Sequence, residues 1–261
     1  MYMYRRIVMS ERMEVGRVQN QVVVVTGAAR SIGAAIAEAL ADAAAGVLVH
    51  YRGREAEAAA VVARIVAGGV DAIAVQADLR EPGAAERLID AADTRWGRVD
   101  VVIANAGVPN PGADVLHGTD DDFASVLETN TRAVYSVLRA AANALAPDGR
   151  LINIGSSSTL YPAPERALYA ASKAGPLVLT RALATSLAPR GATANSVIAG
   201  PIADGFLAGR GADQLESLAS QSPFGRLGTA DDIAGVVAFL ASDAARWITG
   251  QEILVNGGAL G

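Results

Sequence analysis

The sequence contains no cysteine and only two histidines in 261 residues. The absence of cysteine excludes disulfide bonds, thiolate nucleophiles and zinc–sulfur sites, and two imidazoles are too few for a three-histidine metal centre. We therefore expect no metal site. Any proton or hydride chemistry must depend on other groups.

An excess of positive charge is also missing. The 22 lysines and arginines are outnumbered by 27 aspartates and glutamates, which gives a net charge of -5, and no basic run compensates for this locally. Nucleic acid is not an expected partner, because binding it requires cationic groups that neutralise phosphates.

Long apolar runs are absent from the N-terminal segment. Residues 1–20 mix polar and apolar side chains, so neither a secretory signal nor a membrane span is indicated. We expect a cytoplasmic protein without a membrane partner. Residues 1–18 are expected to form a mobile extension, and residues 19–261 the folded domain.

The rest of the chain has the composition of a large buried core. With 51% hydrophobic residues and only 19% charged residues, it suits a sheet that helices cover on both faces. Short apolar runs predict seven strands, at residues 22–26, 46–51, 71–76, 99–105, 150–155, 193–198 and 252–256. Alanine-rich stretches predict helices between them, at residues 32–43, 55–67, 84–96, 131–145 and 230–241. This alternation predicts a single-domain α/β Rossmann fold with a seven-stranded, doubly wound parallel sheet.

Residues 201–223 interrupt the alternation with glycines and one short amphipathic stretch. Such a composition is typical of a loop that covers a site, so we expect a substrate lid here. A passive surface excursion is the alternative, and length alone does not separate the two.

A glycine turn joins the first predicted strand directly to a helix, with Gly27, Ser31 and Gly33 in the turn. The helix N-terminus can present backbone N–H groups to a pyrophosphate, so we expect a dinucleotide here. Ser31 either contacts that phosphate or caps the helix through its hydroxyl. Because serine disfavours positive φ, its backbone is either ordinary or modestly strained.

The end of the second strand distinguishes between cofactors. An acidic residue at this place would bind a ribose 2′-hydroxyl and repel a 2′-phosphate, but the chain has Tyr51 followed by Arg52. Arg30, in the glycine turn, is a second guanidinium that can bind the phosphate. NADP(H) is therefore the expected cofactor, and the alternative is that both arginines are solvated surface residues.

Tyr169 and Lys173 are four residues apart in the sequence YAASK, hence on one face if this segment is helical. A nearby ammonium lowers the pKa of a phenol, so the pair could transfer a proton near neutral pH. A surface pair is the alternative. Ser156 ends a predicted strand thirteen residues earlier, where it or its neighbours Ser157 and Ser158 could also simply cap the strand.

Taken together, these motifs resemble the short-chain dehydrogenase/reductase family over about residues 20–258, and within it the 3-oxoacyl-[acyl-carrier-protein] reductases and related ketoreductases. Thr26, Gly27 and Gly33 match the family's glycine turn, T-G-x-x-x-G-x-G, and Ser31 replaces its middle glycine. The stretch FGRLGTADDIAGVVAFLASDAARWITGQEILVNGG, at residues 224–258, also resembles the family's C-terminal part.

The resemblance implies a catalytic set of Asn130, Ser156, Tyr169 and Lys173. NADPH would pass a hydride to a ketone carbon while Tyr169 protonates the oxygen. Ser156 would hydrogen-bond the carbonyl, Lys173 would bind the ribose, and Asn130 would hold a water beside the lysine. For Asn130 a helix cap is the alternative.

The resemblance also implies which residues line the cofactor. They are Gly27, Arg30, Ser31, Ile32, Gly33, Tyr51, Arg52, Asp78, Leu79, Asn105, Ala106, Gly107, Tyr169, Lys173, Gly200 and Ile202. Asp78 and Leu79 would flank the adenine, although Asp78 could instead be a charge at a helix N-terminus. A small-molecule carbonyl substrate is expected between residues 159–161, the turn after Gly107 and residues 202–207.

Some positions depart from the family pattern. Asp204 stands where a threonine would bind the carboxamide, Asn256 replaces a commonly acidic residue, and Pro176 should bend the helix that carries Lys173. An alcohol or sugar dehydrogenase working oxidatively and a catalytically silent nucleotide-binding protein remain alternative functions. The resemblance further implies a homotetramer, in which helices from the Asn130 and Tyr169 regions pair.

Overall fold

Seven parallel strands form one sheet in the computed structural model, which describes residues 20–42, 44–109, 114–203, 205–207 and 209–259. The strands are β1 (Val22–Val25), β2 (Gly46–Tyr51), β3 (Ala72–Gln76), β4 (Val101–Ala104), β5 (Arg150–Ser156), β6 (Thr193–Ala199) and β7 (Glu252–Val255). Their order in the sheet is β3-β2-β1-β4-β5-β6-β7. All seven predicted strands are present, and the predicted doubly wound α/β fold is confirmed.

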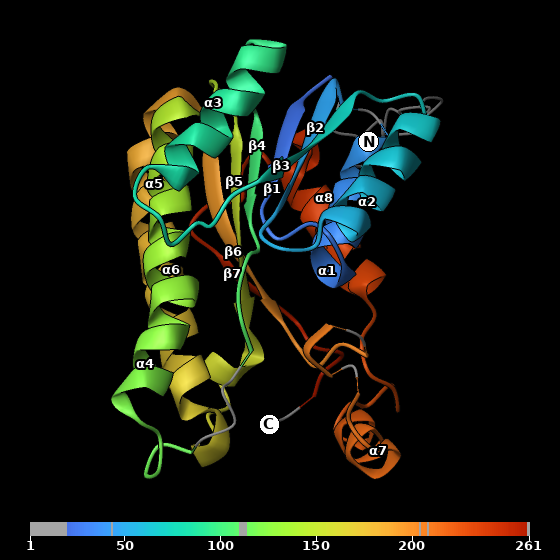
Figure 1. Ribbon diagram of the computed structural model, residues 1–261, viewed down its shortest axis with the longest axis vertical. Coiled ribbons are helices and arrows are strands. Elements are labelled where there is room, and N and C mark those ends of the chain that lie inside the picture. Colours follow the sequence, from blue (N-terminus) through green and yellow to red (C-terminus); the bar gives the residue numbers. More distant parts are fainter. Residues whose placement is uncertain (1–19, 43, 110–113, 204, 208, 260–261) are drawn as a thin grey trace, which may run out of the picture.

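Helices cover both faces of the sheet, in three layers (Figure 1). One face carries α1 (Ser31–Ala41), α2 (Glu55–Ala67) and α8 (Ala230–Ala241). The other carries α3 (Ala84–Trp96), α5 (Val134–Ala144) and α6 (Ala167–Leu187), with α4 (Asp120–Leu127) at the end of this layer. Buried aliphatic side chains form one cluster on each face, so the sheet is apolar on both sides.

The strand order reverses beside β1, because β2 follows on one side and β4 on the other. In open α/β sheets, ligands bind at such a switch point, outside the carboxyl ends of the strands. Gly27 follows the end of β1 and Asn105 follows the end of β4. The fold therefore brings the predicted cofactor residues to one edge of the sheet.

The helix expected at residues 131–145 is longer and less regular than the sequence indicates. The chain is helical from α4 through a π-helical segment, η1 (Glu128–Ala133), into α5. Thr119 and Asp122 form a capping box at the start of α4, which fixes where this helix begins. Short π-helical insertions occur frequently at functional sites, and this one contains Asn130.

The segment at residues 201–223 contains two short helices, η5 (Gly205–Leu207) and α7 (Ala212–Ser220), beyond the end of β6. It is anchored by a parallel bridge between Ile202 and Gly228. The expected extension at residues 1–18 lies outside the described residues. In the described part of the chain, no helix combines the length and apolarity needed to cross a membrane.

Candidate active site

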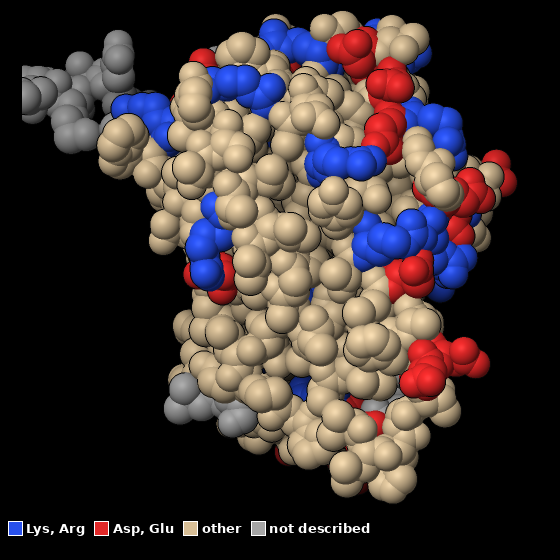
Figure 2. All heavy atoms as spheres, turned by 90° about the vertical axis from the view of Figure 1, so that its left-hand side faces the viewer, with Lys and Arg blue, Asp and Glu red and all other residues tan. Residues whose placement is uncertain are grey.

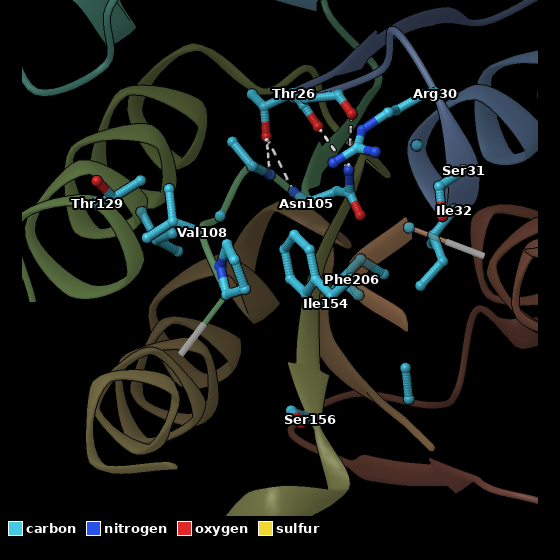
Figure 3. A pocket seen from close by; sticks show the side chains of 18 of the residues that line it. Thr26, Arg30, Ser31, Ile32, Asn105, Val108, Thr129, Ile154, Ser156 and Phe206 are labelled. Carbon is cyan, nitrogen blue, oxygen red and sulfur yellow. Dashed lines mark hydrogen bonds between the residues drawn. The ribbon is translucent and has the colours of Figure 1, made fainter. Parts of the chain in front are cut away.

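A cavity of about 870 Å³ runs along the carboxyl edge of the sheet and collects nearly all of the predicted site residues (Figure 3). It is bounded by the ends of β1, β2, β4, β5 and β6, by α6 and by η5. Of the predicted catalytic and cofactor residues, only Asn130 is missing from its lining. The cavity therefore joins the expected nucleotide and catalytic sites into one site.

The glycine turn leaves no room for side chains at its two glycines. Gly27 has a φ of +65°, and a Cβ atom there would lie 2.9 Å from the Cα of Ala106. A Cβ at Gly33 would lie 2.3 Å from the carbonyl oxygen of Gly27. The turn is thus packed against the end of β4, and its backbone stays open to a ligand in the cavity.

Thr26 and Asn105 hold this packing together (Figure 3). The Thr26 hydroxyl accepts hydrogen bonds from the backbone N–H groups of Asn105 and Ala106, at 2.9 and 3.0 Å. The Asn105 side-chain amide donates to the carbonyls of Thr26 and Gly27, at 2.9 and 3.1 Å. Asn105 therefore lines the cavity as predicted, and its amide nitrogen braces the glycine turn.

Ser31 is the first residue of α1 and has a φ of +52°, in the left-handed region. The N-cap residue of α1 is Arg30, which makes no side-chain cap bond, and the two roles expected for the Ser31 hydroxyl stay predictions. Of the two backbone conformations expected for Ser31, the structure has the strained one. The Ser31 hydroxyl lies close to η5, since a Cβ at Gly205 would be 2.7 Å from it.

His50 is a site residue that the sequence analysis missed. Its Nδ1 accepts the N–H of Gly27 at 3.0 Å, and its Nε2 lies 3.1 Å from the Ala77 carbonyl, to which it donates. Its backbone carbonyl also accepts the N–H of Ala28 at 2.8 Å. Burial lowers the pKa of His50, so the neutral tautomer with the proton on Nε2 joins the glycine turn to the end of β3.

Four arginines line the nucleotide end of the cavity: Arg30, Arg52, Arg54 and Arg80. Arg54 pairs with Glu57 at 2.9 Å, and Arg80 pairs with Asp78. Neither Arg30 nor Arg52 forms an ion pair with a residue that the structure describes. Two guanidinium groups in the lining of this cavity are therefore available to an anionic ligand.

Asp78 lies after the end of β3 and lines the cavity as expected. The alternative of a helix N-terminal charge is not supported, because α3 begins at Ala84. Hydrogen bonds from the Arg80 side chain lower the pKa of Asp78 to about 2, so this carboxylate is ionised at neutral pH. Leu79 is buried beside it.

Tyr169 lies near the start of α6, one turn before Lys173, so the predicted helical pair is present. Its phenol lies close enough to Ser156, the last residue of β5, for the serine side chain to lower the pKa of the phenol. The Phe206 ring of η5 contacts the Tyr169 ring edge-on, with ring centroids 6.5 Å apart. Burial raises the pKa of Tyr169, against the opposing effect of the Ser156 side chain, and outweighs any lowering by the Lys173 ammonium.

Lys173 is the only lysine in the sequence, and it is 6% exposed. Its Nζ donates to the Ile154 carbonyl at 3.3 Å. A Cβ at Gly107 would lie 3.2 Å from this Nζ and 3.0 Å from the Asn130 Oδ1, so the three residues meet at one point. Burial lowers the pKa of Lys173 to about 8.

Asn130 lies fully buried behind the cavity, within η1. Its Oδ1 accepts the N–H of Val108 at 2.8 Å, and its Nδ2 donates to the Val108 carbonyl and the Ser172 hydroxyl, at 3.1 and 3.0 Å. The alternative of a helix cap does not hold, because the residue is interior to a continuous helical segment. Its side chain fixes the strand end at Gly107–Val108 against α6.

The substrate end of the cavity differs from the expectation at one wall. Val108, Ile202, Phe206 and Leu207 line it as predicted, but residues 159–161 do not. Their place is taken by Ser157, Ser158, Arg166 and Arg210. The chain turns through a 3₁₀ segment after Ser156, which aims residues 159–161 away from the cavity. Asp204 lies outside the described residues.

Comparison with known proteins places the chain among oxidoreductases. A family model described as enoyl-(acyl carrier protein) reductase matches residues 27–259. An uncharacterized oxidoreductase of Methylorubrum extorquens is 42% identical, over 93% of this chain and 98% of its own. The 3-oxoacyl-[acyl-carrier-protein] reductase FabG of Staphylococcus aureus is 37% identical, over 90% and 96%. A short chain dehydrogenase from Burkholderia cenocepacia, solved in complex with NADP, is 38% identical with a TM-score of 0.85, over 93% and 99%.

Proposed function

Because the chain belongs to the short-chain dehydrogenase/reductase family, we propose that it reduces a ketone to a secondary alcohol with NADPH, and that Tyr169 is the general acid. Membership establishes an NAD(P)-dependent dehydrogenase/reductase acting on small molecules. The observation that supports the finer proposal is the meeting of Tyr169, Ser156 and Lys173 in the cavity that also holds the glycine turn, with Tyr169 one turn from Lys173 on α6.

The residues at the nucleotide end fit a dinucleotide. A Cβ at Gly27 or Gly33 would collide with neighbouring backbone atoms, so this tight turn requires glycine at both positions. The backbone of the turn can then bind a pyrophosphate at the N-terminus of α1. Arg30 and Arg52 carry the charge and donor geometry for a 2′-phosphate, next to Tyr51 where an acid would repel it. The relative solved with NADP supports the same cofactor for this chain.

The chain's own groups suit proton delivery to a carbonyl oxygen. When bound, the dihydronicotinamide cofactor supplies the hydride to the carbonyl carbon. The Tyr169 phenol gives its proton to the carbonyl oxygen, which becomes the alcohol hydroxyl, and the Ser156 hydroxyl donates a hydrogen bond to that oxygen. The Lys173 ammonium, one turn along α6, stabilises the phenolate that remains.

The Tyr169 phenol is protonated at neutral pH, the form that the proposed reduction requires. Because burial raises its pKa, the phenol holds its proton and is ready to act as an acid. Oxidation of an alcohol would instead require the phenolate as a base. Reduction therefore needs no prior ionisation of Tyr169, whereas oxidation does.

Replacement of Tyr169 by Phe tests the acid. It keeps the ring contact with Phe206 and removes only the hydroxyl, so we expect turnover to fall at least about a hundredfold, the scale of general acid catalysis, with NADPH binding retained. Oxidation of NADPH is followed by absorbance with a ketone, a 3-oxoacyl thioester and a 2-enoyl thioester. Near-normal turnover of Tyr169→Phe would remove Tyr169 from the mechanism. Turnover of the enoyl substrate alone would replace ketone reduction by reduction of a carbon–carbon double bond.

Exchange of the residues at the end of β2 tests the cofactor preference. Charge-assisted hydrogen bonds contribute about 1.5–3 kcal/mol each, so Arg30 and Arg52 together should favour NADPH over NADH about a hundredfold in kcat/KM. The double change Tyr51→Asp and Arg52→Ala should reverse this order, because the carboxylate repels the 2′-phosphate and accepts from the ribose hydroxyls. Equal kcat/KM values for the two cofactors in the unchanged enzyme would show that the arginines are solvated surface residues.

We also propose that four copies of the chain assemble through two separate faces. The face of α5 and α6 carries few charged side chains over its centre (Figure 2), and Tyr135 and Val178 are exposed on these two helices. Phe239, Trp247 and Leu254 are exposed on and beside α8 and β7. Two self-complementary faces on one chain generate a closed tetramer with dihedral symmetry.

A further inference from the structure

Pro176 interrupts the hydrogen-bond ladder of α6 three residues after Lys173. The helix nevertheless continues from Ala167 to Leu187, with Pro176 buried inside it. A proline has no N–H, so the carbonyl of Ser172, four residues earlier, cannot receive its helical hydrogen bond. This carbonyl belongs to a residue between Tyr169, the proposed proton donor, and Lys173, which is proposed to stabilise the phenolate.

Thr131 supplies the missing donor from another element. Its hydroxyl, on η1, donates to the Ser172 carbonyl at 2.7 Å. Gly175 provides the room for this contact, because a Cβ there would lie 3.2 Å from the Thr131 methyl group. Three positions thus act together: Pro176 frees the carbonyl, Gly175 leaves space, and Thr131 binds the carbonyl.

The same segment also binds the Ser172 side chain. The Ser172 hydroxyl accepts from the Asn130 amide at 3.0 Å and donates to the Tyr169 carbonyl at 2.7 Å. Ser172 is fully buried, so neither of its polar groups can turn to water. Neighbouring residues of η1 therefore hold both polar groups of the residue that precedes Lys173.

We propose that Thr131 is a positioning residue, which replaces the helical hydrogen bond removed by Pro176 and so holds the Tyr169–Lys173 turn of α6 against η1. This inference rests on the proposed function for the roles of Tyr169 and Lys173. Without the Thr131 hydroxyl, the Ser172 carbonyl is left buried without a strong donor, and the backbone that carries Lys173 shifts. The Lys173 Nζ then loses its placement between Ile154 and Gly107.

A double-mutant cycle tests the proposal. Thr131→Val keeps the shape and removes the donor, and we expect kcat to fall tenfold or more while the KM for NADPH changes less than twofold. Pro176→Ala restores an N–H to the helix and should leave kcat within twofold. In the double variant the restored backbone N–H at position 176 can bind the Ser172 carbonyl, so most of the lost kcat should return.

Two further variants serve as controls. Thr131→Ser retains the hydroxyl and should retain kcat. Thr180→Val removes a buried threonine hydroxyl that donates to the Pro176 carbonyl at 2.8 Å, one turn farther along the same helix. This matched change should lower the melting temperature and leave kcat within twofold. Equal losses of kcat in Thr180→Val and Thr131→Val would show that general destabilisation of α6 explains the effect, and would overturn the proposal.

A readout without substrate separates this inference from the proposed function. Because Lys173 is the only lysine, protein labelled with isotopic lysine gives one side-chain NMR signal that reports its environment and titration. Thr131→Val should shift this signal and the midpoint of its pH titration. The double variant, which also carries Pro176→Ala, should restore both. If the double variant restores the Lys173 signal but the protein reduces no ketone, the positioning role is retained and the proposed function is rejected. An unshifted signal in Thr131→Val, or one that the double variant leaves shifted, would overturn the positioning role. If Thr131→Val does not fold, folding of the double variant supports the proposal and its failure to fold contradicts it.

Discussion

Lys173 combines burial with a functional position, and its protonation should limit the reaction at alkaline pH. Burial disfavours the ammonium and lowers the pKa to about 8, so the side chain is mostly charged at pH 7 and mostly neutral at pH 9. In the proposed mechanism the ammonium stabilises the Tyr169 phenolate, so kcat/KM for ketone reduction should be constant below pH 7 and fall as the pH passes about 8. The measurement is a pH–rate profile of NADPH oxidation.

The matched control for this profile is Lys173→Arg. A guanidinium stays charged throughout the accessible range, so the decline near pH 8 should disappear in this variant even where its overall rate is reduced. A profile of the unchanged enzyme that stays level to pH 10 would contradict the role of the ammonium.

His50 should control cofactor binding without taking part in chemistry. It holds the glycine turn through the Gly27 N–H and the end of β3 through the Ala77 carbonyl. His50→Leu removes both bonds, and we expect the KM for NADPH to rise about tenfold, in line with the loss of one or two buried hydrogen bonds, with a smaller change in kcat. His50→Asn keeps an acceptor near the place of Nδ1 and should show a smaller rise in KM. A selective loss of kcat in His50→Leu would show that His50 acts elsewhere.

The site residues that could be predicted from the sequence are those whose role follows from a local motif. The glycine turn, Arg52 after its strand, and the Tyr169–Lys173 spacing each occupy a few consecutive positions. His50 and Thr131 could not be found in this way, because they bind partners 23 and 41 residues away. Ser31 shows a similar limit, since the sequence left two backbone conformations open and only the fold selects one.

Among the elements, the strands and the regular helices could be predicted because apolar runs and turn residues determine them. The bounds of α2, α3 and α8 agree with the sequence expectation at both ends. The α4 helix was missed, although Thr119 followed by Asp122 is a capping signal. The π-helical turn of η1 has no comparable signal, because it depends on packing against α6 through Asn130 and Thr131.

The N-terminus of α8 should make a measurable contribution to stability. Thr229 and Asp232 form a capping box there, and Arg226 binds the Asp232 carboxylate at 2.6 Å. Thr229→Ala should lower the free energy of unfolding by about 1 kcal/mol, which for a chain of this size corresponds to about 2–4 °C in Tm. Thr229→Ser should have little effect. Calorimetry on the three proteins is the measurement, and an unchanged Tm in Thr229→Ala would show that the box adds nothing to stability.

For the whole molecule, the proposed tetramer predicts a stepwise dissociation. A charge placed on one face should leave the other interface intact, so Val178→Asp and Trp247→Asp should each yield dimers. Both changes together should yield the 26.6 kDa monomer. Light scattering during size-exclusion chromatography at micromolar concentration gives the masses. A monomeric mass for the unchanged protein would reject the tetramer, and unchanged tetramers in both single variants would place the interfaces elsewhere.

The single lysine also has a consequence for chemical labelling. Amine-directed reagents normally modify many lysines on the surface of a protein. Lys173 is the only lysine of this chain, and its side chain lies in the cavity of the candidate active site. Because its pKa is about 8, a large share of this amine is nucleophilic in mildly alkaline buffer. An amine-reactive dye small enough to enter the cavity would therefore label this side chain besides the α-amino group, and a bound dinucleotide would block only the label in the cavity.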